Sequence, residues 1–407
     1  MTKELTKKDK KSGTAEPQAQ SAFRTDPVLC FLKAKSAPVR MWGMSPRERL
    51  VTQFANEGIT EIIALDDLAT HNGPVILLRE DCVIDPPLVP VIAKRPEFAL
   101  LSDVASDSSA MSVHTRSEAA LEAAEAMQAG EDLPATLNLI ARRPSELSAT
   151  FWGKLRKREV PYARAVSPDT REETEWRMFM GTYKGATDLV TKYLWPRPAF
   201  YVTRALAPTS VTPNLVTALS AVCVVLAFWL FWEGQFLAGL VAAWMMTFLD
   251  TVDGKLARTT LTSSKWGDVF DHGIDLIHPP FWWWSWAVGA GMGASASSGA
   301  EPLLAPALAT IVAGYIAQRL EEGWFIARFG ADMHTWRRFD SVFREVTARR
   351  NPNLLILTAS TALGLPAEGL VVVAAWVAIC FAVHFCRIVQ AHLAARHGPL
   401  VSWMAEP

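Results

Sequence analysis

The sequence predicts a multi-domain protein: an all-α bundle of six transmembrane helices, preceded by a small soluble α/β domain and an interfacial amphipathic helix. The 407 residues are enough for two domains. After residue 210, long apolar segments alternate with polar links, which is typical of a multi-pass membrane protein. Before that point, short apolar runs alternate with helical patterns, which favours a mostly parallel sheet.

The composition argues against several classes of protein. The formal net charge of -1 comes without a basic domain, so we expect no nucleic-acid partner. The five cysteines are scattered without CxxC spacing, which argues against disulfides and zinc. The first residues are polar and rich in lysine, and no apolar segment follows them, so a signal peptide is not expected.

The first 150 residues are expected to contain a tail and the α/β domain. Residues 1–26 are polar and predict a disordered tail. Residues 27–150 carry the pattern of the α/β domain. Its expected helices are residues 46–57 and 117–129, and its expected buried strands are residues 61–65, 74–78 and 98–101.

Residues 151–207 connect the two halves of the chain. Their first part is charged and is expected to be a linker. Segment 184–207 is amphipathic, with aromatic side chains on one side and Lys and Arg on the other. Such a helix fits the cytoplasmic surface of a membrane, and packing on the soluble domain is the alternative.

The membrane domain is expected at residues 208–398 and contains six apolar runs. They predict spans at residues 214–231, 237–255, 269–292, 303–325, 353–365 and 369–389. Several tryptophans fit an aromatic belt at the membrane surface: Trp229, Trp232, Trp282, Trp283, Trp284 and Trp286.

Loop charges predict the orientation of the spans. The links after the first, third and fifth spans contain no Lys or Arg, whereas the links after the second and fourth contain several. By the positive-inside rule, both chain ends and the charged links face the cytoplasm. We therefore expect a multi-pass protein of the inner (cytoplasmic) membrane.

Four aspartates lie where the second span leads into the third. Asp250 and Asp253 are i and i+3, and Asp271 and Asp275 are i and i+4, so each pair shares a helix face. If the link between the two segments is a turn, the four carboxylates converge. At an effective dielectric of about 20 they would repel one another by several kcal/mol, so the cluster must take up protons or cations. Oxygen ligands on rigid helices suit Mg²⁺ or Mn²⁺.

Small residues and a cation accompany the acids. Gly254, Ala257 and Gly267 leave room for a ligand or a facing helix to approach the backbone. Arg258 offers a guanidinium fork that suits phosphate. Carboxylates, a divalent ion and an arginine together indicate a phosphoryl-transfer site.

The spacing D-x2-D-G-x2-A-R-x8-G-x3-D-x3-D holds at every fixed position from Asp250 to Asp275. It resembles the signature of the CDP-alcohol phosphotransferases, which are integral membrane enzymes of phospholipid synthesis. The resemblance implies transfer of a phosphatidyl or other phosphoalcohol group from a CDP-alcohol to a hydroxyl acceptor, with release of CMP. CDP-diacylglycerol is the expected donor, and a polar CDP-alcohol such as CDP-inositol is the alternative.

The same resemblance implies roles for individual residues. Asp250, Asp253 and Asp271 would be ligands of two divalent ions, and Asp275 would be the general base that also touches the second metal. The site for the CDP group would comprise Asp253, Gly254, Ala257, Arg258 and Gly267, with Asn214 and Thr217 at the start of the first span. For the last two, a role limited to starting the helix is the alternative.

Two arginines, Arg349 and Arg350, lie at the expected cytoplasmic start of the fifth span. An acceptor that itself carries a phosphate, such as inositol phosphate or glycerol phosphate, would need such cations. A solvated, positively charged loop is the alternative.

Residues 75–86 (VILLREDCVIDP) look like the strand-plus-acid region of sugar-phosphate nucleotidyltransferases. Those enzymes need a Gly-rich loop to hold a triphosphate, and the sequence contains no G-G-x-G-x-x-R motif. We therefore expect a nucleotidyltransferase-like but non-catalytic domain. Residual nucleotide or sugar-phosphate binding through Asp81 and Asp85 is the alternative.

Two other functions fit an aspartate cluster in a membrane protein. A cation transporter is one, but transport sites lie near the bilayer midplane and the spans show no inverted repeat. A catalytically inactive membrane anchor is the other, and the four intact aspartates argue against it. A homodimer is compatible with the small residues of the spans.

Overall fold

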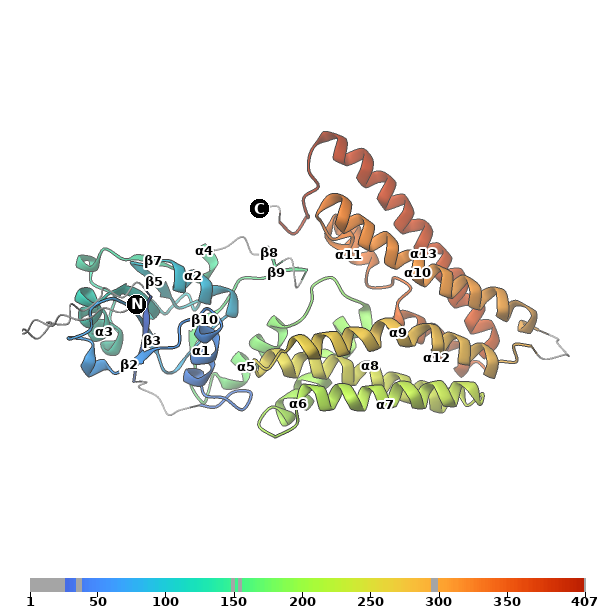
Figure 1. Ribbon diagram of the computed structural model, residues 1–407, viewed down its shortest axis with the longest axis horizontal. Coiled ribbons are helices and arrows are strands. Elements are labelled where there is room, and N and C mark those ends of the chain that lie inside the picture. Colours follow the sequence, from blue (N-terminus) through green and yellow to red (C-terminus); the bar gives the residue numbers. More distant parts are fainter. Residues whose placement is uncertain (1–25, 34–38, 148–150, 153–155, 294–298, 406–407) are drawn as a thin grey trace, which may run out of the picture.

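The computed structural model describes residues 26–33, 39–147, 151–152, 156–293 and 299–405. The expected disordered tail lies outside the described residues, except for Asp26. The described chain is mostly helical, with a sheet-containing region toward its N-terminus and long helices beyond it (Figure 1). We call residues 28–165, from the first strand to the last, the front region.

A six-stranded sheet forms the centre of the front region, in the order β2-β1-β3-β6-β5-β7. β1 is parallel to β2 and β3, and β5 is parallel to β7. β6 runs antiparallel to β3 and β5, so the sheet is mixed, where the sequence pattern favoured a mostly parallel one. The strands are β1 Val28–Leu32, β2 Ile62–Ile63, β3 Pro74–Arg79, β5 Phe98–Leu101, β6 Ala110–Arg116 and β7 Ile140–Arg142.

Helices cover both faces of this sheet. Side chains alternate along β1, so Leu29 packs on the face covered by α1 and α2, whereas Cys30 packs on the face covered by α3. A sheet buried on both faces is built from continuous apolar runs, as in β1 and β3. The remaining elements are α1 Pro46–Ala55, α2 Val89–Lys94, α3 Ser117–Ala129, α4 Pro144–Leu147, and the strand pairs β4 Cys82–Ile84 with β10 Ala163–Ala165 and β8 Phe151–Trp152 with β9 Lys157–Arg158.

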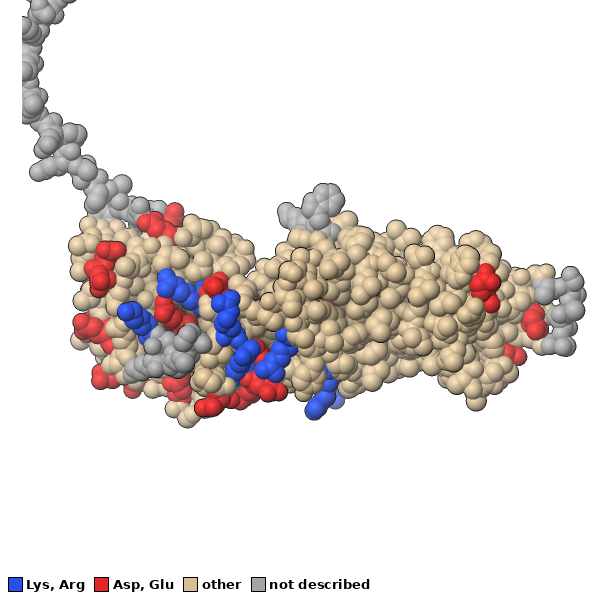
Figure 2. Space-filling model, turned by 90° about the horizontal axis from the view of Figure 1, so that it is seen from below, with Lys and Arg blue, Asp and Glu red and all other residues tan. Residues whose placement is uncertain are grey.

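Six long or apolar helices pack together beyond the front region, and we call them the bundle (Figure 1). Four helical stretches among the described residues are long and apolar enough to cross a membrane: Pro213–Trp232, Phe236–Thr259, Glu301–Phe329 and Pro366–His397. Charged side chains gather on the front region and at its junction with the bundle, whose visible face carries few of them (Figure 2). These features indicate a membrane protein. The bundle helices are α7 Pro213–Trp232, α8 Phe236–Thr259, α9 Lys265–Gly289, α10 Leu304–Phe329, α12 Arg350–Ala362 and α13 Pro366–Ala394, with the short α11 Arg338–Phe343 before α12.

Between the front region and the bundle lie α5 (Arg171–Gly181), a π-helical turn (Val190–Leu194) and α6 (Pro196–Leu206). The amphipathic helix expected over residues 184–207 is therefore shorter, and α6 begins at Pro196. Proline is accepted in a first helical turn but not in a helix interior, which explains the break. α6 buries Phe200 between Trp42 of the front region and the aromatic side chains of α5.

Three tryptophans of α9 are buried and do not form a surface belt. Trp282, Trp283 and Trp286 are at most 2% exposed and pack with Phe231 in the core of the bundle. The indole N–H groups of Trp282 and Trp286 donate to main-chain carbonyls at 3.0 and 2.9 Å, which lets these side chains be buried. The belt prediction is wrong for these three residues. The exposed tryptophans of the predicted set are Trp229, Trp232 and Trp284.

Gly289, the last residue of α9, lies where α9 meets the end of α7. A Cβ atom there would sit 1.9 Å from the main-chain oxygen of Phe231. We expect Gly289→Ala to lower the Tm of the full chain by several degrees, because the backbone must shift. The control is Gly323→Ala in α10, where no described atom lies within 4 Å of the new Cβ and the Tm should be unchanged or slightly higher. Equal Tm values for the two variants would contradict this packing.

Candidate active site

The aspartates of the signature lie on two consecutive helices. α8 carries Asp250 and Asp253, and α9 carries Asp275 and, one turn earlier, the backbone of Asp271. Residues 260–264 connect the two helices. The side chain of Asp271 lies outside the described part of the structure.

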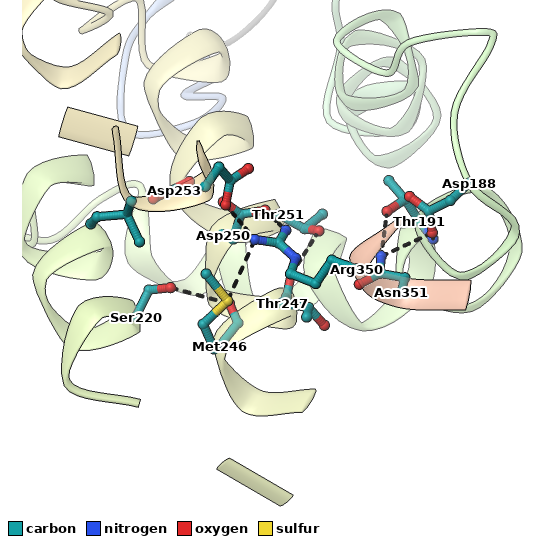
Figure 3. Close-up of polar contacts among 12 residues, drawn as sticks. Asp188, Thr191, Ser220, Met246, Thr247, Asp250, Thr251, Asp253, Arg350 and Asn351 are labelled. Atoms are coloured by element: carbon teal, nitrogen blue, oxygen red, sulfur yellow. Dashed lines mark hydrogen bonds and ion pairs between the residues drawn. The ribbon is translucent and has the colours of Figure 1, made fainter. Parts of the chain in front are cut away.

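A single arginine bridges the two helices. Arg350, the first residue of α12, donates from Nη2 to Oδ2 of Asp250 at 2.5 Å (Figure 3). Its Nη1 donates to Oδ1 of Asp275. The guanidinium side chain is only 17% exposed, so the pairing is poorly screened by water. The structure thus brings Asp250 and Asp275 within reach of one cation that comes from a third helix.

Asp253 is more buried than Asp250 and Asp275, at 3% exposure. Thr217 of α7 donates from Oγ1 to its Oδ2 at 2.6 Å. Its other oxygen, Oδ1, is buried and has no hydrogen-bond partner among the described residues. Buried carboxylate oxygens normally have a partner, so this oxygen fits a ligand for a bound cation.

Asp250, Asp253 and Asp275 line one cavity of about 570 Å³. Its carboxylate end contains these three acids and all the other residues predicted to hold the CDP group: Asn214, Thr217, Gly254, Ala257, Arg258 and Gly267. Five further basic residues of its wall, which we call its cationic end, are Arg156, Lys184, Arg319, Arg344 and Arg349. One cavity therefore offers both a set of acids and a set of cations.

Two glycines in this wall allow close approach of polar groups. A Cβ atom on Gly254 would lie 2.9 Å from Nη2 of Arg258, one helical turn further on. A Cβ atom on Gly267 would lie 3.1 Å from Oδ1 of Asn214. Glycine at these positions lets the guanidinium and the amide rest against the helix backbone.

The two arginines predicted to bind an acceptor phosphate have different partners. Arg350 pairs with the aspartates of the carboxylate end, as described above. Arg349 donates from Nη2 to Glu322 of α10. Glu322 also contacts Nε2 of His334 at 3.2 Å and Nη1 of Arg319 at 3.5 Å, so it is a counter-ion for both Arg319 and Arg349.

Arg344 is a further residue of the cationic end, which the sequence did not single out. It lines the cavity, and its buried Nε and Nη1 have no hydrogen-bond partner among the described residues. Burial lowers the pKa of its guanidinium, although an arginine stays charged in proteins. A buried cation with free donors fits an anionic ligand. The positive loop holds several arginines, and no spacing distinguishes this one.

The start of α12 is fixed by a second set of contacts that the sequence did not indicate. Nδ2 of Asn351 donates to Oδ1 of Asp188 at 2.9 Å and to Oγ1 of Thr191 at 3.2 Å (Figure 3). These partners lie more than 150 residues apart in the sequence, so no local pattern connects them. The contacts tie the start of α12, and with it the neighbouring Arg350, to the segment around the π-helical turn.

The acids of the front region suspected of binding nucleotide are both buried. Asp81 forms a bidentate ion pair with Arg79, whose Nε and Nη2 each donate to one carboxylate oxygen at 2.9 Å. Burial raises the pKa of Asp85 to about 7. Neither residue lines the cavity.

Part of the chain matches a known protein family. Residues 210–384 match the family model described as CDP-alcohol phosphatidyltransferase. This part of the chain is similar to CDP-alcohol phosphatidyltransferases, and we call it the family-matching segment. It contains α8, α9 and all the residues of the carboxylate end of the cavity.

Three curated proteins match part of this chain. The archaetidylinositol phosphate synthase of Pyrococcus horikoshii is 38% identical over 80 residues, which cover 19% of this chain and 42% of that protein. The phosphatidylinositol phosphate synthase of Streptomyces avermitilis is 32% identical over 94 residues, covering 23% and 37%. An uncharacterized class-I family protein of Dictyostelium discoideum is 27% identical over 106 residues, covering 23% and 27%. The chain thus spans less than half the length of these relatives.

A solved structure also matches part of this chain. The crystal structure of Mycobacterium tuberculosis phosphatidylinositol phosphate synthase with CDP-DAG bound is 18% identical in sequence, with a TM-score of 0.35. The match covers 47% of this chain and 94% of the solved chain.

Arg350→Gln tests the charge compensation at the carboxylate end. In EDTA the variant should have a Tm several degrees below that of the wild type, because Asp250 and Asp275 lose their shared counter-ion. Mg²⁺ or Mn²⁺ should restore most of the difference, since a divalent ion compensates the same charges. The control Arg338→Gln changes an exposed arginine and should leave the Tm unaltered in both buffers. An unchanged Tm for Arg350→Gln in EDTA would count against the compensating role.

Proposed function

We propose that the chain is an integral membrane CDP-alcohol phosphotransferase of phospholipid biosynthesis. It transfers a phosphatidyl group from CDP-diacylglycerol to a hydroxyl acceptor and releases CMP. The observation that carries this proposal is the meeting of acids from α8 and α9 at one cavity, within the domain that matches the family. A polar CDP-alcohol donor would use the same residues.

The proposal includes a topology. The six bundle helices α7, α8, α9, α10, α12 and α13 would be six spans, four of which meet the requirement of length and apolar composition. Both termini and the cavity would face the cytoplasmic side of the inner membrane, because the connections on that side carry the arginines. A homodimer within the membrane is part of the proposal, as the resemblance to the family implies.

The proposed division of the chain follows the sequence. Residues 1–26 would be a tail, 27–150 a nucleotidyltransferase-like domain without its own catalysis, 151–207 a linker with the juxtamembrane helix, and 208–398 the membrane domain. The burial of Asp81 and Asp85 supports the non-catalytic assignment of residues 27–150, because buried carboxylates are poorly placed to meet a nucleotide.

The residues of the carboxylate end fit divalent metal ions. Asp250, Asp253, Asp271 and Asp275 would hold two ions, Mg²⁺ or Mn²⁺, and the unpartnered oxygen of Asp253 supports this assignment. When bound, such ions neutralise the diphosphate of the donor and stabilise the CMP leaving group.

The residues of the chain would then act on the bound substrates. The carboxylate of Asp275 accepts the proton of the acceptor hydroxyl, whose oxygen forms a bond to the β-phosphorus of the CDP-alcohol. The bond from that phosphorus to the bridging oxygen breaks, and CMP leaves with the electron pair. Thr217 keeps Asp253 oriented through its hydrogen bond, and Arg258 is placed to pair with the diphosphate.

The cationic end supports an acceptor that carries a phosphate. Arg344 has free buried donors there, and Arg349 lies in the same wall. Inositol phosphate and glycerol phosphate are acceptors of this class. Two of the partial relatives are named as synthases of inositol phosphate lipids, which favours inositol phosphate.

The reaction is tested with the full chain in nanodiscs, supplied with CDP-diacylglycerol, Mg²⁺ or Mn²⁺ and a panel of acceptors. CMP should be released only with the correct acceptor, and mass spectrometry of the lipid product identifies it. Asp275→Asn should lower kcat by about 10² to 10⁴-fold, the usual contribution of a general base. Asp169→Asn, which changes an exposed aspartate, serves as control. Full activity of Asp275→Asn would refute the assignment of the base.

The affinity for the acceptor substrate provides a separate test of the cationic end. Arg344→Gln should raise the KM for a phosphorylated acceptor by about 10 to 10²-fold, because it removes charged hydrogen-bond donors. The KM for CDP-diacylglycerol should change by less than about twofold. A KM for the acceptor equal to that of the wild type would exclude Arg344 from the acceptor site.

A further inference from the structure

The front region and the bundle share one hydrophobic cluster. Trp42 of the front region lies 5.9 Å from Phe179 of α5 and 5.6 Å from Phe200 of α6, measured between ring centroids. Val252 and Leu256 of α8 belong to the same cluster and are fully buried. Val252 precedes Asp253 directly in the sequence. The side of α8 next to its acids is therefore packed in a cluster to which the front region contributes residues.

An arginine of the front region reaches the end of α8. Arg49 of α1 is 4% exposed, and its Nη1 donates to the main-chain oxygen of Thr259, the last residue of α8. No described carboxylate lies within ion-pair distance of Arg49. The last carbonyl groups of a helix lack partners within it and carry the negative end of its dipole. Arg49 thus caps the helix that bears Asp250 and Asp253.

The helix that carries Arg49 is held in place by its own contacts. α1 begins with a capping box in which Ser45 and Glu48 exchange hydrogen bonds. Further along α1, Nε2 of Gln53 donates to the main-chain oxygen of Ile84 in β4 at 3.1 Å. The capping box fixes the start of α1, and the Gln53 contact ties the helix to β4, so together they restrict where the Arg49 side chain lies.

Other contacts secure the same junction. Gly43 has a positive φ of 78°, and a Cβ atom on it would lie 2.6 Å from the main-chain oxygen of Ala207, just after α6. On α8, Nζ of Lys255 donates to the main-chain oxygen of Thr182 at 3.1 Å and lies 3.3 Å from the ring centroid of Tyr183. The front region also supplies Arg156 to the cavity wall.

We propose that the front region serves the transferase site as a positioning domain, and that Arg49 is the positioning residue. Arg49 holds the point at which α8 ends and the turn to α9 begins. Ser264, at the far side of this turn, caps α9 by accepting a hydrogen bond from Gly267 at 3.0 Å. The turn sets how the acids of α8 and α9 face each other. This proposal rests on the proposed function for its effect on catalysis, but not for its effect on the helix end.

The first experiment compares three variants of the full chain. Arg49→Met removes the donor and keeps the bulk of the side chain, whereas Arg49→Lys keeps a charge and a donor. Arg47→Met is the matched control, because Arg47 lies on the same helix but is exposed and pairs with Glu80. Hydrogen–deuterium exchange of residues 256–264 and the kinetics of CMP release are measured for each.

Arg49→Met should speed exchange across residues 256–264 by about tenfold or more, because the buried carbonyl of Thr259 loses its partner. The same variant should lower kcat by about 10 to 10²-fold with little change in the KM for the donor, as expected when reacting groups are misplaced. Arg49→Lys should recover most of both effects, and Arg47→Met should show neither. A merely structural role would lower the Tm without this separation of kcat from KM.

A second pair of variants perturbs the junction from another side. Gly43→Ala forces a Cβ atom against Ala207, whereas Gly58→Ala adds one at a similar positive φ of 86° with no described atom within 4 Å. Both substitutions carry the same backbone strain, so their difference reports the contact alone. Gly43→Ala should speed exchange in residues 256–264, and Gly58→Ala should not. This pair decides the question if Arg49→Met fails to fold.

The outcomes separate the two proposals. Wild-type exchange of residues 256–264 in both Arg49→Met and Gly43→Ala would overturn the positioning role. So would faster exchange with a wild-type kcat, because the helix end would then not control the site. If the wild type releases no CMP, the proposed function fails, and the exchange data alone decide whether the front region holds α8.

Discussion

Two neighbouring helices carry negative charge at one end of an apolar bundle. The arrangement of this half of the chain depends on how that charge is compensated. Carboxylates in such surroundings need compensating charge from elsewhere in the fold. α12 supplies it through Arg350, which lies between Asp250 and Asp275. α7 adds a hydroxyl from Thr217 to the deeper Asp253. Four helices are thus tied to one another by polar groups at the same level, in addition to the apolar packing between them.

The residues at the carboxylate end could be foreseen because their spacing is local. Helical periodicity alone places Asp250 beside Asp253, and a short turn is enough to bring the next helix alongside. The partners at the cationic end lie far apart in the sequence, and neither Arg344 nor the contact between Asp188 and Asn351 follows from any repeat. Long-range pairs of this kind are chosen by tertiary packing, which a single sequence does not reveal.

The same distinction holds for the fold. The long apolar helices and the helix from 46 were predictable from periodicity and end signals, and the structure has α1 at Pro46–Ala55. The direction of β6 was not, because the pattern of a buried strand is the same in either orientation. The prediction was wrong for Trp282, Trp283 and Trp286 of α9, because the residue type alone does not distinguish a tryptophan at the membrane surface from one in the core.

The buried tryptophans of α9 also have a consequence for the intrinsic fluorescence of the protein. Trp282 and Trp286 lie within 6.0 Å of Phe231, centroid to centroid, in surroundings that exclude water, so their emission is expected at short wavelength. Trp229, with 62% of its surface open, is in contrast accessible to quenchers carried by lipid tails. Quenchers carried by lipid tails should therefore act on exposed tryptophans such as Trp229 and leave the emission of Trp282 and Trp286 unchanged.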